Sequence, residues 1–295
     1  MTLSLFLQSI FSGLTNGFVY GLVGLGLSAI FRGSRVVNAM QGDFCVVSGF
    51  AAVLLLDRFQ WPLWMVLPAA TGAGGLLGLA IEVVPVRALR RRGGQENGFL
   101  LLTLGVAFAI SSLTLYLIGR DSRMLPGIGG EGSIVIADAA IRVHALWLIA
   151  ISVLVMFALR WFYTRTPAGL AMMAASIDAD GAATMGIDVP LMRTATFGIG
   201  GLIGGLAGVL VTPLTTMHYA MGLLFTLKGF AAAILGGLGN PFGAVVGGMT
   251  LGLVEALAIA FVSSGYKDAI AMAILIAIMI LMPDGILGRR SRRGG

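Results

Sequence analysis

The run TATFGIGGLIGGLAGVLVTPLTT at residues 194–216 contains no charged residue and decides the fold of this chain. One helical crossing of a hydrocarbon core roughly 30 Å thick needs about 20 apolar residues, and this run is long enough. Glycines recur within it, mostly three or four residues apart, at Gly198, Gly201, Gly204, Gly205 and Gly208. Small residues on one face let membrane helices approach closely, because lipid provides no hydrophobic drive for their association. The run therefore predicts a tightly packed membrane helix.

The rest of the chain has the same character. It is 58% hydrophobic and 11% charged, with a mean hydropathy of +0.97, whereas a soluble domain is roughly a quarter charged. No segment alternates as the strands of a membrane barrel do. We therefore predict an all-α, polytopic membrane helix bundle of eight or nine transmembrane helices, forming one domain over residues 1–295. The expected spans are 4–31, 36–56, 62–86, 97–118, 144–163, 194–216, 221–239, 242–262 and 266–287.

The basic residues are distributed as in a membrane protein. The formal charge is +6, and arginines cluster at the ends of apolar runs, notably at residues 87–92 and 289–293. Because cytoplasmic loops are enriched in Lys and Arg, these segments and residues 160–193 are expected on the cytoplasmic side. Counting crossings then places the N-terminus outside and the C-terminus inside. The pattern argues against nucleic acid as a partner, and the single Cys45 excludes an internal disulfide.

A weak internal repeat appears at an offset of 180 residues. The sequence GFAA at 49–52 recurs at 229–232, and Gly42 corresponds to Gly222. The topology makes the two copies run in opposite directions. Inverted repeats are common in transporters, where discontinuous helices line the solute site.

Two polar segments stand at equivalent places in the repeat. Asn38, Gln41, Gly42 and Asp43 lie between apolar runs and are read either as an unwound segment lining a solute pathway or as a cytoplasmic turn in which Asp43 caps the next helix. Their counterparts are His218, Tyr219 and Gly222, where His and Tyr could instead anchor a membrane interface. As pathway residues, both sets would offer polar contacts to a small solute.

Lys228 and Glu255 are charged residues inside two neighbouring predicted spans, 221–239 and 242–262. A charge at the bilayer centre costs about 2.5–3.5 kcal/mol on insertion scales, so it normally finds a partner. We expect Lys228 and Glu255 to pair with each other across neighbouring helices, or each to contact a partner subunit. The alternative function for these two residues is a proton relay. The sequence contains no phosphate-binding loop and no HExxH or GxSxG motif. No enzyme activity, bound cofactor or metal site is therefore predicted.

Residues 164–193 form the longest polar interruption. Pro167 suits the first turn of a helix, and Asp178 and Asp180 can cap or charge-complement a following helix start. Two short cytoplasmic helices are expected. They would be either a docking ridge for a soluble partner or surface helices lying on the membrane.

Several motifs together resemble a known family. They are RVVNAMQGDF at 35–44, TPAGLAM at 166–172, KGFAAAILGGLG at 228–239, GLVE at 252–255, YKDA at 266–269 and PDGILG at 283–288. They resemble the permeases of branched-chain amino acid-type ABC importers, specifically the shorter permease subunit of the high-affinity leucine/isoleucine/valine system. Residues 180–186 resemble the coupling motif of ABC importer permeases, Glu-Ala-Ala-x-x-x-Gly. Here Asp180 replaces the usual Glu and Gly181 replaces the first Ala, while Ala182 and Gly186 fit.

The resemblance implies a permease of the bacterial inner membrane that forms a heterodimer with a sister permease. Two cytoplasmic ATPases, which would carry ATP and Mg, and a periplasmic solute-binding protein would complete the importer. Residues 164–193 would be its cytoplasmic coupling loop. The implied ATPase contacts are Asp178, Asp180, Gly181, Ala182, Met185 and Gly186. The solute would be a branched-chain amino acid or a related small amino acid or amide. The alternative function is an ATP-independent channel or facilitator for urea or small amides, which would not need this loop.

Overall fold

The computed structural model describes residues 3–130 and 132–261, and beyond these residues 269, 273, 276, 277, 285 and 286. Most of the described chain is helical, and six helical segments are long and apolar enough to cross a membrane. The elements are α1 (Leu3–Ser34), α2 (Gln41–Asp57), α3 (Leu63–Ile81), the π-helical turn η1 (Glu82–Val86), α4 (Arg87–Arg91), α5 (Glu96–Ile118), β1 (Ser133–Ile136), β2 (Ala139–Arg142), α6 (Val143–Arg165), α7 (Pro167–Ile177), α8 (Ala179–Thr184), α9 (Val189–Val211), α10 (Met221–Gly236) and α11 (Pro241–Phe261). The predicted polytopic helix bundle is confirmed. The span expected at 266–287 and the motifs at 266–269 and 283–288 fall almost entirely outside the described residues.

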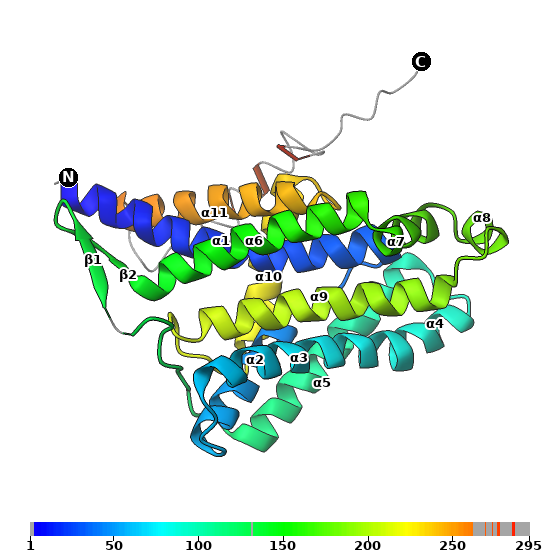
Figure 1. The fold of residues 1–295 in the computed structure, drawn as a ribbon, viewed down its shortest axis with the longest axis horizontal. Coiled ribbons are helices and arrows are strands. Elements are labelled where there is room, and N and C mark those ends of the chain that lie inside the picture. Colours follow the sequence, from blue (N-terminus) through cyan, green and yellow to red (C-terminus); the bar gives the residue numbers. More distant parts are fainter. Residues whose placement is uncertain are drawn as a thin grey trace.

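The long helices lie side by side along the longest axis of the molecule (Figure 1). The N-terminus of α1 and the β1–β2 hairpin lie at one end, and α4, α7 and α8 lie at the other (Figure 1). The first end is held by a hydrogen bond of 2.9 Å from the Ala140 backbone N–H to Gln8 Oε1. At the other end, Arg32 near the end of α1 stacks over the ring of Tyr163, 5.4 Å from its centroid.

The hairpin is a departure from the predicted purely helical fold. β1 and β2 are antiparallel, with Ser133 opposite Arg142. The two residues between them, Ala137 and Asp138, have φ of 50° and 62°. Such a two-residue turn matches the right-handed twist of the strands. Residues 137 and 138 are Ala and Asp rather than the Asn-Gly or Asp-Gly pair that usually indicates this turn, so no hairpin was expected here.

The 180-residue repeat is present at the level of whole elements. Shifting α1, α2 and α3 by 180 residues superimposes their bounds on those of α9, α10 and α11 to within a few residues, apart from the longer first helix. α1 runs away from the hairpin end whereas α9 runs toward it, and α3 and α11 are likewise opposed (Figure 1). The repeat is therefore inverted, as predicted.

Each repeat contains a broken crossing. After α1 ends, residues 35–40 turn back into the bundle without helical structure, and α2 begins only at Gln41. The predicted start at residue 36 is wrong, because residues 36–40, which are apolar apart from Asn38, hold an irregular backbone. Asn38, Gln41 and Asp43 are at most 2% exposed. The segment is therefore not a solvent-exposed turn, and irregular backbone at this depth is tolerated because protein surrounds it.

The third helix continues past its predicted end. The arginine segment at 87–92 was expected as a break, yet α3, η1 and α4 run without interruption from Leu63 to Arg91. Pro85 lies inside the π-helical turn. Proline has no N–H and its ring clashes with the preceding turn, which accounts for the local widening. The helix thereby carries its arginines beyond the apolar part of the span.

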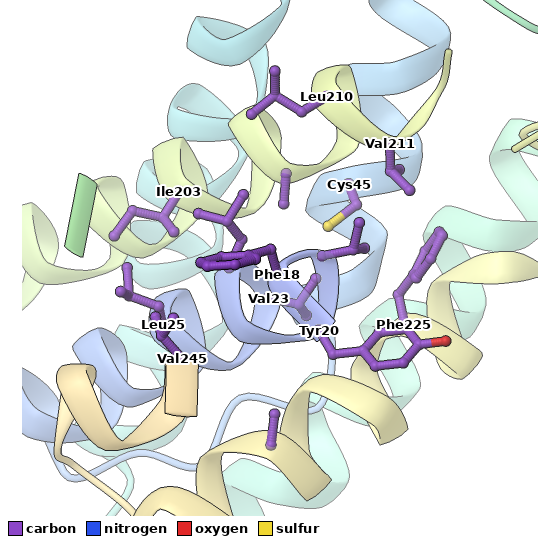
Figure 2. Close-up of a cluster of buried hydrophobic side chains, with 14 of the residues drawn as sticks. Phe18, Tyr20, Val23, Leu25, Cys45, Ile203, Leu210, Val211, Phe225 and Val245 are labelled. Carbon is purple, nitrogen blue, oxygen red and sulfur yellow. The ribbon is translucent and has the colours of Figure 1, made fainter. Parts of the chain in front are cut away.

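The core forms around α1. Side chains from α1, α2, α9, α10 and α11 meet in one buried apolar cluster (Figure 2). Glycines allow close approach of α1 and α11: a Cβ added at Gly17 would lie 2.7 Å from Met249 Cα, and one at Gly21 would lie 3.1 Å from Val245 Cα. The glycine series predicted on α9 is also used for packing, since a Cβ added at Gly205 would lie 2.8 Å from the Thr71 carbonyl oxygen of α3.

Candidate solute pathway and coupling site

The first turns of the two broken-crossing helices, α2 and α10, meet inside the bundle. A Cβ added at Gly42 would overlap the carbonyl oxygen of Gly222 and lie 2.7 Å from the backbone nitrogen of Thr226. A Cβ at Gly222 would in turn overlap the Asp43 carboxylate. The Gly42 N–H donates to Thr226 Oγ1 at 2.8 Å. The repeat-related glycines therefore mark one crossing point, where the two backbones are in contact.

The amides of the first break hold its irregular backbone in place. Asn38 Nδ2 donates to Gln41 Oε1 at 3.2 Å, and Asn38 Oδ1 accepts the Met40 N–H at 3.2 Å. Gln41 Nε2 donates to the Gly200 carbonyl of α9 at 2.9 Å. Both side chains are fully buried. In this conformation the side-chain amides of the two predicted pathway residues form their hydrogen bonds within the protein itself.

Asp43 is placed differently. It lies in the first turn of α2 and makes no side-chain cap, so its predicted capping role is wrong. It is 2% exposed, and its Oδ2 atom has no hydrogen-bond partner among the described residues. The positive ends of two helix dipoles face this carboxyl group, which favours a negative charge there. Asp43 is therefore a buried polar group with unused bonding capacity at the crossing point.

The second break lies closer to the surface. His218 and Tyr219 are half-buried and their rings pack edge to face, 6.2 Å apart. The Tyr219 carbonyl accepts a hydrogen bond of 3.0 Å from Ser111 Oγ of α5. Thr103 of the same helix accepts the Ala39 N–H of the first break at 3.0 Å. α5 thus supports both breaks through two hydroxyl side chains, a role that its mostly apolar sequence did not indicate.

The two intramembrane charges form an ion pair. Lys228 Nζ of α10 lies 2.9 Å from Glu255 Oε1 of α11, and the same ammonium donates to the Tyr20 hydroxyl of α1 at 3.0 Å. The expected pairing across neighbouring helices is present. The repeat-related positions are occupied by Ser48, Gly75 and Gly200, so this charged connection between α1 of the first repeat and α10 and α11 of the second has no counterpart at those positions.

The predicted loop at 164–193 contains the two short helices expected there. Thr166 caps α7 by accepting the Gly169 N–H at 3.0 Å. Asp178 caps α8 through the Gly181 N–H at 3.0 Å, and Asp188 caps α9 through the Leu191 N–H at 3.0 Å. Asp180 does not cap; it lies in the first turn of α8, where its charge complements the helix dipole.

Gly186 has a conformational role that explains the glycine in the motif. Its φ is +82°, and the Gly186 and Ile187 N–H groups donate to the Ala183 and Ala182 carbonyls. This is the Schellman ending of a helix, in which glycine adopts the left-handed conformation at little cost. Ala182 is buried against Ala175 and Val189. The motif residues therefore shape a compact turn that returns the chain into α9.

The outer face of this turn is exposed and partly apolar. Met185 is 83% exposed and Ile177 is 72% exposed, while Asp178, Asp180 and Gly186 also face outward. Gly181 is half-buried beside the Asp178 carboxylate. An exposed apolar side chain beside two carboxylates, on a fixed backbone, is a surface suited to contact with another molecule.

Broken helices related by an inverted repeat, inside an all-helical bundle, define a multi-pass membrane transport protein. The chain belongs to the family described as branched-chain amino acid transport system / permease component, whose profile matches residues 9–282.

Several relatives match this chain over most of their own length. The high-affinity branched-chain amino acid transport system permease protein LivH of Salmonella typhimurium is 28% identical, over 96% of each chain. The corresponding permease protein BraD of Pseudomonas aeruginosa is 29% identical, again over 96% of each chain. A probable branched-chain amino acid transport permease protein LivH of Methanocaldococcus jannaschii is 29% identical over 90% of this chain and 88% of its own. These relatives are named as permease components.

Proposed function

We propose that this chain is the transmembrane permease subunit of a binding-protein-dependent ABC importer for branched-chain amino acids or related small amino acids or amides. The observation that carries the proposal is the capped pair of short helices α7 and α8, which exposes Asp180, Met185 and Gly186 at one end of the bundle. A passive channel has no need of such a projection. The family match supports the same conclusion.

The proposal fixes an orientation and a set of partners. The end with α4, α7 and α8 faces the cytoplasm of a bacterial cell, where two ATPase subunits bind ATP and Mg and contact residues 164–193. The end with the hairpin and the N-terminus faces outward and receives the solute-binding protein. The C-terminus is cytoplasmic. A sister permease completes a heterodimer around the pathway, so that motion of the coupling helices opens one side and closes the other.

The pathway passes the crossing point of α2 and α10. Contact between Gly42 and Gly222 closes it in the present conformation, so transport requires these first turns to separate. The exposed N-terminus of α10 would then offer N–H groups to a solute carboxylate. Asp43, with its unpaired oxygen, would face the solute ammonium group. A zwitterionic amino acid presents both groups.

Reconstitution tests the proposal. The chain co-expressed with the proteins encoded beside it should bring down nucleotide-binding subunits, and vesicles containing the complex should accumulate solute only with ATP and binding protein. Solute flux through vesicles that lack any ATPase would instead establish the facilitator.

Changing the exposed motif residues should uncouple transport. We expect Asp180→Lys and Gly186→Arg each to reduce ATP-driven uptake about tenfold or more, since an unmatched charge in a contact costs several kcal/mol. The chain should stay folded, because both positions are exposed and no atom lies within 4 Å of a Cβ at Gly186. The left-handed backbone of Gly186, with φ of +82°, adds a local cost of about 1–2 kcal/mol for arginine, so Asp180→Lys is the cleaner of the two variants. The measurement is uptake alongside solute-stimulated ATP hydrolysis and ATPase co-purification.

Asp57→Lys is the matched control, because Asp57 is an exposed carboxylate at the opposite end of the bundle. It should leave ATPase co-purification unchanged. Normal uptake in both motif variants would rule out this turn as the coupling contact.

A further inference from the structure

A basic pocket lies at the end of the bundle that also carries α7 and α8. It is a cavity of about 320 Å³ lined by Glu82, Arg87, Arg90, Arg91, Pro190 and Arg193. Its walls are the end of the Leu63–Arg91 span and the start of α9, which meet there. The pocket is separate from both the α2–α10 crossing point and the exposed motif face of α8.

The charges in this pocket do not balance. Glu82 is 1% exposed, and its Oε1 pairs with Arg90 Nη1 at 2.9 Å. Arg87 donates to Thr194 Oγ1 at 2.8 Å. Arg91 and Arg193 form no hydrogen bond or ion pair within the part of the chain that the structure describes. Four guanidinium groups thus share one carboxylate, and a bound anion would relieve their mutual repulsion.

The chemistry and shape of the pocket indicate the type of anion. Arginine presents a planar fork of N–H donors that matches the oxygens of a phosphate, often in pairs of hydrogen bonds. Arg90 is also held in place by stacking over the Phe99 ring, 5.4 Å from its centroid. Fixed and free guanidinium groups therefore converge on one cavity, as a phosphate site requires.

The surroundings favour a lipid over a soluble phosphate. Val83 is 44% exposed and Val84 is 67% exposed on the turn that precedes the arginines, and Leu191 is 56% exposed on α9. These apolar side chains are sequence neighbours of the lining residues Glu82 and Pro190, at the end of the Leu63–Arg91 segment that is long and apolar enough to span a membrane. Basic pockets between transmembrane helices at this level bind anionic head groups, and the exposed valines would contact the acyl chains.

We propose that this pocket binds the phosphate of an anionic phospholipid, with Arg91 and Arg193 as the principal contacts. Because Pro190 and Arg193 lie within the first five residues of α9, the lipid anchors the helix that directly follows α8. The pocket is then a lipid site at the junction of the bundle and its two short helices.

Lipid titration of the intact transporter tests this. The complex is purified in a neutral detergent, stripped of lipid and titrated with phosphatidylglycerol, phosphatidylcholine or inorganic phosphate, and bound lipid is counted by native mass spectrometry. We expect preferential binding of phosphatidylglycerol. The double variant Arg91→Gln/Arg193→Gln should weaken phosphatidylglycerol binding about 30-fold. Each arginine near an anionic head group contributes about fivefold, and the two factors multiply.

The control removes the same charge elsewhere at this end. Arg92→Gln/Arg160→Gln changes two exposed arginines that do not line the pocket, so it should leave binding within about twofold. The single variant Arg91→Gln alters an exposed side chain and should still fold, with about a fivefold loss.

Three results would overturn the lipid site. The first is equal weakening by the pocket and control pairs. The second is inorganic phosphate that displaces the lipid at similar concentration, which would indicate a soluble anion. The third is loss of co-purifying ATPase subunits from the pocket variant while lipid binding persists, which would indicate a protein contact.

Discussion

Gly42→Ala is expected to abolish transport and to destabilise the folded protein by about 3 kcal/mol or more, at the upper end for overpacked cores. The added methyl group would overlap the Gly222 carbonyl oxygen and crowd the Thr226 nitrogen. Both are backbone atoms of α10, so no side-chain rotation can relieve the contact. The two broken crossings would have to move apart. Thermal unfolding of the purified protein and solute uptake in vesicles measure the two effects.

Gly72→Ala provides the control for this substitution. Gly72 lies within α3, and no heavy atom lies within 4 Å of a Cβ built there. Alanine should be neutral or stabilising by up to about 1 kcal/mol, because it favours helix more than glycine does. A Gly42→Ala protein with the stability and uptake of Gly72→Ala would contradict the close crossing of α2 and α10.

Lys228→Met is expected to destabilise the protein by about 3–5 kcal/mol, because it leaves the carboxylate of Glu255 buried and unpaired. Glu255 is 2% exposed, and its second oxygen already lacks a partner among the described residues. Glu255→Met should cost a similar amount of folding free energy, because the buried Lys228 ammonium group loses its counterion. The stabilities of the variants are compared by heating each protein and measuring the fraction that stays folded by size-exclusion chromatography.

The double variant Lys228→Met/Glu255→Met separates charge pairing from packing. Replacing both charges with apolar groups of similar volume is often near neutral, so stability should largely return. Adding Tyr20→Phe should remove the remaining cost, since the Tyr20 hydroxyl loses its donor in the double variant. If the loss of stability in the double variant instead equals the sum of the losses in the two single variants, the two charges are energetically independent.

The positions of the helices could be predicted because span length and hydrophobicity depend on local sequence. The repeat was visible from Gly42 and Gly222, which must both be glycine for the same steric reason. The pairing of Lys228 with Glu255 followed from the cost of an isolated charge in a membrane. In each of these cases, the physical requirement at the position can be met by only a few residue types or by only one kind of contact.

Other features depended on contacts that no local pattern contains. α2 begins at Gln41 because Ala39 is bonded to Thr103 of α5, a residue 64 positions away. The amides of Asn38 and Gln41 are used inside the protein, which their sequence neighbours do not reveal. The basic pocket needed the approach of the arginine segment to Arg193. Such tertiary contacts determine the structure at these positions, and the local sequence pattern does not predict them.

The most direct test of a driven importer is a cross-link from residue 185. Met185→Cys places a thiol on a site that is 83% exposed, while the native Cys45 is 1% exposed and remains inaccessible to reagents. In membranes containing the whole transporter, this thiol should cross-link to an ATPase subunit, with a yield that changes when ATP is bound. Val135→Cys, 64% exposed on the hairpin at the opposite end, should give no such product. An active transporter in which residue 185 never joins an ATPase subunit would contradict the account.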